Sequence, residues 1–161
     1  MDPAVLRGMA RWPDVPAVYG WLALDRRGNW RLKEAVSGRF GRIGNAALRD
    51  FIGRNYASDG AGQWFFQNGP QRVYVSLAYT PLVVHYAGEQ LFDHCTRPFT
   101  AREAFQDDEG AVLLVGERAV ALLDDRDLAR YADLAAQPLP VIPRADVAMR
   151  FGFVAEPEPR P

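Results

Sequence analysis

A glycine-spaced loop with two arginines is the segment of this sequence best suited to hold an anion. Three glycines stand at every third position, Gly38, Gly41 and Gly44, with one arginine in each of the two gaps. Glycines let backbone N–H groups converge, and paired guanidinium forks can hold a phosphate or a carboxylate. The loop runs into an expected helix, whose first N–H groups add partial positive charge. The candidate ligand-binding residues are Gly38, Arg39, Gly41, Arg42 and Asn45.

The same loop has a simpler interpretation. Its glycine spacing matches neither a P-loop, which needs a Gly-Lys-Ser/Thr sequence, nor the dinucleotide fingerprint that follows a strand. A flexible connection between a hairpin and a helix, with solvated arginines, is the favoured interpretation of the pattern. The anion site at residues 37–45 is therefore a hypothesis for experiment.

The two histidines of the chain are the candidates for metal binding. In a hairpin over residues 82–95, His85 would lie opposite Phe92, and His94 would be its diagonal neighbour on the same face. Cys95 would point to the opposite face, because side chains alternate along a strand. Zinc sites use three or four protein ligands, and the chain has only two histidines and one cysteine. We expect no metal site and no cofactor, with His85 and His94 as the residues to test.

Other chemistry is disfavoured by the residue patterns. The chain has no Gly-x-Ser-x-Gly sequence, so a serine hydrolase elbow is not expected. Aromatic residues and an arginine at Trp64, Phe66, Arg72 and Tyr74 resemble a platform for stacking bases. They lack the glycine-aromatic run of an RNA-recognition strand and are more typical of a sheet core, so nucleic-acid binding is not expected.

The elements that position these residues are mostly strands. Alternating apolar patterns and turn residues predict successive hairpins, and apolar spacing predicts a helix over 45–56 and another over 126–135. The expected strands are 18–24, 29–34, 63–67, 72–79, 82–86, 91–95, 111–115 and 118–123. We therefore predict an α+β fold: a mainly antiparallel meander of about eight strands, as a curved sheet or partly open barrel, with two main helices. No internal repeat is visible.

The domain limits follow the prolines. Residues 1–17 contain three prolines and are expected to form an N-terminal arm without a regular element. Residues 18–137 form the expected single α+β domain. Residues 138–161 form a proline-rich C-terminal extension, and disorder is expected over the last six residues.

Composition sets the broad class. The chain has 161 residues, of which 48% are hydrophobic and 24% charged, which excludes a disordered or repetitive fibrous protein. A single cysteine excludes an intrachain disulfide, and no apolar run has the length of a signal peptide or a membrane span. We expect a cytoplasmic protein without a membrane partner.

Charge is divided unevenly along a nearly neutral chain. Residues 1–72 carry 11 basic and 6 acidic residues, whereas residues 73–161 carry 8 and 14. Internal ion pairing explains this division, and so does a basic face for an anionic partner or a homodimer between opposite charges.

Two stretches resemble a family of uncharacterised proteobacterial proteins. They are Gly20–Trp30 and Trp64–Val75, and the resemblance extends from about Trp12 to about Leu134. It implies a bacterial origin, which agrees with the use of arginine in place of lysine, and it implies no activity or site.

The best functional interpretation is a non-catalytic cytoplasmic binding or interaction module. Its partner would be a protein or a small anionic ligand. A non-catalytic role is favoured because no set of titratable residues has the spacing of an active site. The alternative is a small-molecule enzyme or sensor that binds a phosphate- or carboxylate-bearing ligand at residues 37–45. Enzymatic activity is an open question, with the balance against it.

Overall fold

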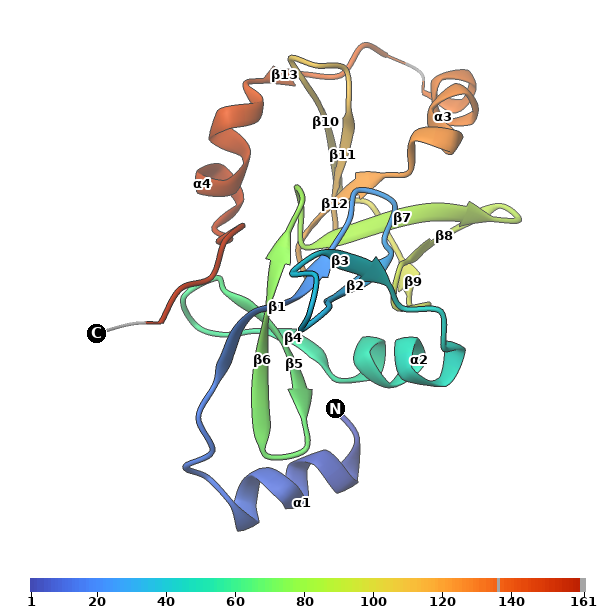
Figure 1. Cartoon of the computed structure of the whole chain (residues 1–161). Coiled ribbons are helices and arrows are strands. Elements are labelled where there is room, and N and C mark those ends of the chain that lie inside the picture. Colours follow the sequence, from blue (N-terminus) through green and yellow to red (C-terminus); the bar gives the residue numbers. More distant parts are fainter. Residues whose placement is uncertain (136, 160–161) are drawn as a thin grey trace. The chain divides into compact units, whose positions relative to one another are not determined.

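The computed structural model describes residues 1–135 and 137–159, and its strands form two separate sheets (Figure 1). The chain divides into two compact units. The first unit contains residues 1–25, residues 29–78 and the chain from Phe153 onward. The second unit contains residues 26–28 and 79–152.

The first unit is built on a six-stranded sheet with the order β3-β2-β1-β6-β5-β4. Its central strands β1 and β6 are parallel, and all the other neighbouring strands are antiparallel. Two helices belong to this unit, α1 and α2. The bounds are α1 Pro3–Arg11, β1 Val18–Leu24, β2 Trp30–Lys33, β3 Phe40–Arg42, α2 Ala46–Arg54, β4 Tyr56–Ser58, β5 Trp64–Asn68 and β6 Gln71–Leu77.

Aromatic side chains form much of the core of the first unit. Tyr56 packs against Trp30 and Trp64, with ring centroids 5.0 and 4.8 Å away, and it is 2% exposed. Phe51 of α2 meets Phe66 of β5 edge to face at 5.4 Å. Buried rings of this size dominate the burial energy of a small core, so these contacts hold α2 against the sheet.

Helix α1 corrects the expectation that residues 1–17 lack a regular element. Pro3 occupies the first turn, where its missing N–H has no intrahelical partner to lose, and the helix ends before Pro13. Val5 is buried, and the backbone N–H of Asp2 donates to Oδ1 of Asn55 at 2.7 Å. The prolines therefore mark the ends of a helix, where the sequence interpretation took them to exclude one.

The second unit is built on a seven-stranded sheet with the order β13-β10-β11-β12-β7-β8-β9. Strands β12 and β7 are parallel at its centre, and β13 is parallel to β10 at one edge. The bounds are β7 Leu82–Ala87, β8 Gln90–Asp93, β9 Pro98–Phe99, β10 Glu103–Asp107, β11 Val112–Val115, β12 Val120–Leu123, α3 Leu128–Leu134, β13 Val141–Ile142 and α4 Val147–Phe151. Short 3₁₀ turns at Asp125–Asp127 and Arg144–Asp146 precede α3 and α4.

The two sheets share one strand order. In each sheet one three-stranded meander starts at the centre and runs outward, and a second runs inward and ends at the centre. The first strand of one meander and the last strand of the other therefore lie side by side, and they are parallel. The meanders are β1-β2-β3 and β4-β5-β6 in the first unit, and β7-β8-β9 and β10-β11-β12 in the second. The fold therefore repeats a topology that the residue pattern does not repeat.

The predicted single meander is wrong. The structure has two open sheets, of six and seven strands, with mixed parallel and antiparallel pairs and four α-helices. The parallel pair β1 and β6 joins segments about 50 residues apart, and hairpin signals describe only neighbours in the sequence. Strands β3, β4, β9 and β13 have two or three residues each, which is too few to show alternation.

Several local predictions are confirmed. Strands β1 and β2 form the expected hairpin, and α2 starts after Asn45. Gln67 pairs with Arg72, which confirms the expected register, but the expected four-residue loop is wrong, because Asn68 pairs with Gln71 and leaves a two-residue turn at Gly69 and Pro70.

Two other local predictions are wrong. A two-residue turn at 116–117 is replaced by a four-residue connection, because Val115 pairs with Val120. Thr100 and Glu103 have the spacing of a capping box, which predicts a short helical turn, but the described chain has none there, and β10 begins at Glu103.

The C-terminal segment also contains regular elements. Residues 138–161 include β13 and α4, and Val147 of α4 is fully buried. The disorder expected over the last six residues concerns in part residues 160–161, which lie outside the described chain. Among the helices described, none is long and apolar enough to cross a membrane.

Candidate functional site

The glycine and arginine loop is exposed and partly extended. Gly38 has a φ of +67°, and Arg39 and Arg42 are both exposed. Residues 40–42 form strand β3, which Arg39 directly precedes. Side chains three positions apart on an extended segment point to opposite sides, so the strand does not aim the two guanidinium groups at one point. Gly41 pairs with Leu32 within the sheet.

The helix start beside this loop is already capped by the chain itself. Oδ1 of Asn45 accepts the N–H of Leu48 at 2.9 Å, and Arg49 donates to the carbonyl of Gly44 at 2.8 Å. These bonds fix the loop to α2 and use one of the N–H groups that an anion would need. Anion binding at residues 37–45 stays a prediction.

The histidines do not gather a metal-ligand set. His85 lies opposite Phe92, as predicted, and Nδ1 of His94 accepts the N–H of Val83 at 3.3 Å. Within residues 1–135 and 137–159, no group of three or more His, Cys, Asp or Glu side chains is placed to hold a metal ion. Burial, with the charge of Asp93, raises the pKa of Cys95 to about 12, so this residue is a neutral thiol at physiological pH.

A cleft in the second unit brings together residues that the sequence interpretation did not connect. It has a volume of about 360 Å³, and we call it the charged cleft. Its lining combines buried leucines with exposed charged residues. The lining residues are Arg26, Arg27, Glu109, Gly110, Ala111, Leu122, Leu123, Asp125 and Leu128.

Arg26 is the unusual residue of the charged cleft. Its guanidinium carbon lies 4.9 Å from the ring centroid of Tyr79, in a cation–π contact. Its Nη1 atom is buried and, among the described residues, has no hydrogen-bond partner. A buried donor without an acceptor costs free energy, so this nitrogen is suited to bind an oxygen of a ligand.

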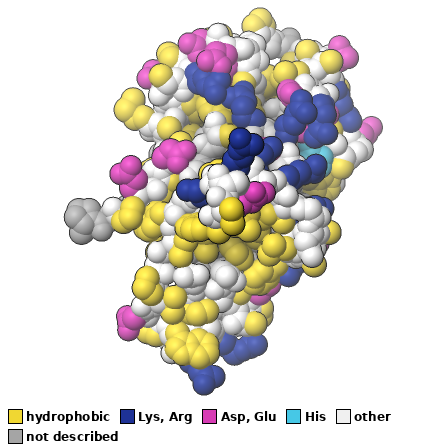
Figure 2. Space-filling view, in the orientation of Figure 1, with side chains coloured by type: hydrophobic (Ala, Val, Ile, Leu, Met, Phe, Trp, Pro, Cys, Tyr) yellow, Lys and Arg dark blue, Asp and Glu magenta, His cyan; other side chains and the backbone are white. Residues whose placement is uncertain are grey.

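The two acidic side chains of the charged cleft are each paired with another arginine. Nη2 of Arg27 lies 2.9 Å from Oδ2 of Asp125, and Arg144 forms an ion pair with Glu109. In the face drawn in Figure 2, Lys and Arg side chains likewise lie beside Asp and Glu side chains. Within the described part of the chain, no carboxylate forms an ion pair with Arg26. Its charge is therefore available to a ligand.

Tyr79 packs against the guanidinium of Arg26, and Asp107 holds Tyr79 in place. The Tyr79 hydroxyl donates to Oδ2 of Asp107 at 2.7 Å, and both residues are buried. Burial, followed by this hydrogen bond, raises the pKa of Tyr79 well above its ordinary range. Oδ1 of Asp107 accepts the N–H groups of Glu109 and Ala111, at 3.0 and 2.7 Å. One carboxylate thus fixes both the ring under Arg26 and the turn that borders the cleft.

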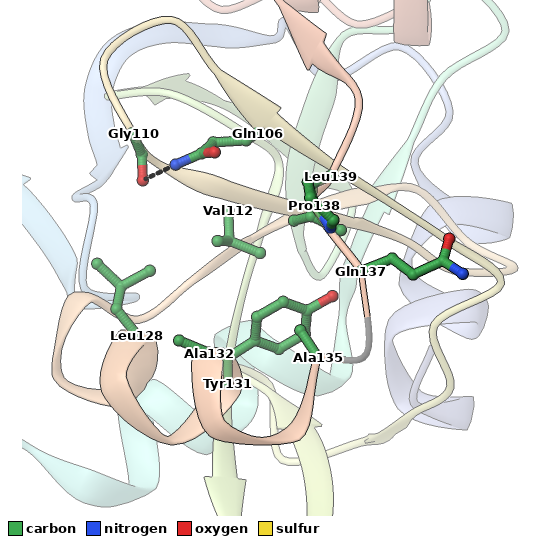
Figure 3. Close-up of a pocket in the computed structure, with 10 residues that line it drawn as sticks. All are labelled: Gln106, Gly110, Val112, Leu128, Tyr131, Ala132, Ala135, Gln137, Pro138 and Leu139. Carbon is green, nitrogen blue, oxygen red and sulfur yellow. Dashed lines mark hydrogen bonds between the residues drawn. The ribbon is translucent and has the colours of Figure 1, made fainter.

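A second, more apolar cleft lies between α3 and the turn that joins β10 to β11 in the same unit (Figure 3). We call it the apolar cleft; its volume is about 490 Å³. Leu128, Tyr131 and Ala132 stand on the side of α3 that faces the turn between β10 and β11. Its lining residues are Gln106, Gly110, Val112, Leu128, Tyr131, Ala132, Ala135, Gln137, Pro138 and Leu139.

Among the described residues, the apolar side of helix α3 is only partly covered. The sequence predicts that Leu128, Tyr131 and Leu134 are buried, yet α3 contains no buried residue. Leu128 and Tyr131 are half-buried along the apolar cleft, and Leu134 is 64% exposed. An amphipathic helix normally buries this stripe, so the cleft provides apolar surface for a ligand.

The sequence contained little that would have located these clefts. Arg26 stands in a turn whose glycine explains the hairpin by itself, and the partners of Arg26 lie at least 53 positions further along the chain. The acidic residues Asp107, Asp108 and Glu109 are typical of a turn, and their spacing points to no ligand. Residues 26–28 connect β1 to β2 of the first sheet, and their contacts place them with the second unit, which no local pattern indicates.

Comparisons with solved structures support the fold. A DUF1285 family protein from Silicibacter pomeroyi DSS-3 matches with a TM-score of 0.57 and 16% identity, over 85% of this chain and 78% of the other. A DUF1285 family protein from Shewanella baltica OS155 matches with a TM-score of 0.51 and 12% identity, over 70% and 90%. At these identities the likeness concerns the fold alone.

Comparison with families of sequences identifies the chain more directly. No curated protein matches it. The model of the family DUF2944, described as "Protein of unknown function (DUF2946)", matches residues 1–158, nearly the full length of the chain. The chain therefore belongs to this family of proteins of unknown function.

Proposed function

We propose that this protein is a non-catalytic binding module for a small organic anion, and that the anion binds Arg26 in the charged cleft. The observation that carries the proposal is the buried Nη1 atom of Arg26, which has no acceptor among the described residues. Leaving a buried donor unsatisfied costs about 1–3 kcal/mol, and more when the group is charged. A ligand oxygen at this position would recover that free energy.

The position of Arg26 also favours binding by reducing its cost. The contact with Tyr79 restricts the guanidinium, and Asp107 restricts Tyr79 in turn. A side chain that is ordered before binding loses less conformational entropy when the ligand arrives. The volume of about 360 Å³ lies within the range of about 300–1,000 Å³ that is typical of small-molecule sites.

Binding is favoured over catalysis by the residue types in the cleft walls. The described lining contains no serine, cysteine, histidine or lysine that would serve as a nucleophile. Its two carboxylates, Glu109 and Asp125, are held in ion pairs with Arg144 and Arg27. These contacts support a role in recognition, and the carboxylates are poorly placed to act as free bases.

Thermal unfolding with added anions tests the proposal. Sodium butyrate at millimolar concentrations should raise the unfolding temperature of the wild-type protein, relative to the same concentration of sodium chloride. Arg26→Gln should abolish this increase, because glutamine keeps some length and polarity and loses the charged fork. Circular dichroism of the unliganded variant checks that it folds.

The loop at residues 37–45 provides the matched control. Arg26→Gln removes one positive charge, and Arg39→Gln/Arg42→Gln removes two from the exposed surface. The double variant should leave the butyrate effect unchanged. If the double variant abolishes the effect and Arg26→Gln keeps it, the anion binds the loop and the proposal is wrong. If no carboxylate stabilises the wild-type protein, the proposal is wrong as well.

A further inference from the structure

We infer that the anion is an amphipathic carboxylate, with its carboxylate on Arg26 and an apolar tail in the apolar cleft beside α3. The inference rests on the proposed function, and it adds the chemical class of the ligand. It follows from how the two clefts adjoin, from the partly covered side of α3 and from the charges around Arg26.

The two clefts adjoin within the second unit. Gly110 and Leu128 line both of them, so a chain that leaves the charged cleft past these residues enters the apolar cleft. Gly110 bears no side chain, and Nε2 of Gln106 donates to its carbonyl at 3.4 Å, so the turn that both clefts share is lined here by backbone and by one amide (Figure 3). A headgroup and a tail therefore have separate but connected spaces.

The walls of the apolar cleft suit a hydrocarbon chain or ring. Val112 is buried at its base, and Leu128, Tyr131 and Ala132 face it from α3 (Figure 3). Pro138 and Leu139 complete the wall after the helix. Because Leu128 and Tyr131 are only half-buried within the described structure, an apolar tail would cover the rest of their apolar surface.

The charges favour a single negative charge on the headgroup. Glu109 and Asp125 are paired with Arg144 and Arg27, so Arg26 leaves a single positive charge without a partner in the cleft. A carboxylate matches that charge with one bidentate contact, whereas a doubly charged phosphate would leave a second negative charge unbalanced. A monoanionic carboxylate is therefore the better match to this site than a phosphate.

A series of carboxylates of increasing chain length tests whether an apolar tail contributes to binding. Isothermal titration calorimetry with butyrate, hexanoate, octanoate and decanoate, each below its critical micelle concentration, should give dissociation constants that fall with length. Complete burial of a methylene corresponds to about a fourfold change, so we expect about two- to fourfold for each added methylene until the cleft is full. Octyl phosphate should bind more weakly than octanoate.

Two substitutions on α3 locate the tail. Ala132→Trp places an indole in the apolar cleft and should remove the gain from octanoate and decanoate while butyrate binding persists. Ala129→Trp is the matched control, because Ala129 is exposed on the same helix and does not line the cleft. It carries the same change in helix propensity and should leave the whole series unchanged.

The outcomes separate the inference from the proposed function. If butyrate and decanoate bind with equal affinity and Arg26→Gln abolishes the binding of both, the anion site is supported and the inference of a bound apolar tail is wrong. The inference of an amphipathic carboxylate is also wrong if Ala132→Trp and Ala129→Trp give identical series of dissociation constants, or if octyl phosphate binds more tightly than octanoate. If 1-octanol binds as tightly as octanoate, or Arg26→Gln binds octanoate normally, Arg26 does not hold the headgroup and the proposed function fails.

Discussion

The hydrogen bond between Tyr79 and Asp107 supports the ring on which Arg26 lies, and Tyr79→Phe removes this bond alone. The ring stays, so the cation–π contact is preserved. The bond is 2.7 Å long, both residues are buried, and the acceptor is a carboxylate. Hydrogen bonds to charged groups contribute about 1.5–3 kcal/mol. Because Oδ1 of Asp107 keeps two backbone N–H donors, we expect a loss of about 2 kcal/mol in the free energy of unfolding at pH 7.

Urea unfolding with two probes assigns this loss to the correct unit. All four tryptophans of the chain, at positions 12, 21, 30 and 64, belong to the first unit, so their fluorescence reports on that unit. Circular dichroism reports on both. We expect Tyr79→Phe to lower the urea midpoint that circular dichroism reports. We expect Tyr86→Phe to change the free energy of unfolding by less than about 0.5 kcal/mol. The described structure gives the Tyr86 hydroxyl no hydrogen bond.

The pH dependence provides a separate check on the same bond. Burial and the Asp107 carboxylate raise the pKa of Tyr79 in the folded state above its ordinary value of 10. A group with a raised pKa contributes stability that is complete below pH 10 and is lost as the pH rises beyond it. The difference between wild type and Tyr79→Phe should therefore narrow above pH 10. A difference that stays constant from pH 7 to pH 11, or a loss below 0.5 kcal/mol at pH 7, would refute this reasoning.

Two further predictions concern close packing in the second unit and the reactivity of its cysteine. Gly28→Ala should cost at least about 2 kcal/mol, because φ is +76° and a new Cβ would lie 2.7 Å from that of His94. Gly20→Ala, with a φ of +73° and open space, should cost about 1–2 kcal/mol, and equal losses by urea unfolding would contradict the overlap. Cys95, buried and with its pKa raised to about 12, should resist iodoacetamide at pH 8 in the folded protein and react in urea. Rapid alkylation without denaturant, measured by mass spectrometry, would show that its burial is not maintained.

The sequence predicted elements well where a single segment carried its own signal. Asn45 was expected to accept hydrogen bonds at a helix start, and it accepts the N–H of Leu48. The register that places His85 opposite Phe92 followed from alternation and a turn of ordinary length. Such predictions depend on residues within one or two turns of each other. They hold wherever tertiary contacts agree with local preference.

The sheet order could not be predicted in the same way. Strands β1 and β6 pair in parallel although they are far apart in the sequence, and β7 and β12 do the same. Each pair lies where the two meanders of its sheet meet. One trace of these pairs was present in the sequence. Residues 82–84 and 120–123 are continuous apolar runs, as is typical of strands buried on both faces, and all of them are buried. The runs indicate central strands, but they do not indicate which strand lies beside which.

The candidate site depends on this long-range order, which explains why the sequence pointed elsewhere. Residues 37–45 attracted attention because their glycines and arginines are adjacent in the chain, and the structure leaves those arginines exposed. Arg26 carries no motif, yet burial of its Nη1 and a neighbouring apolar cleft give it a stronger reason to bind an anion. A charge acquires binding strength from desolvation and from the groups that restrain it, and both come from residues distant in sequence. For a chain without a sequence motif of known chemistry, burial of an unpaired polar atom is therefore a better guide to a site than the spacing of charged residues.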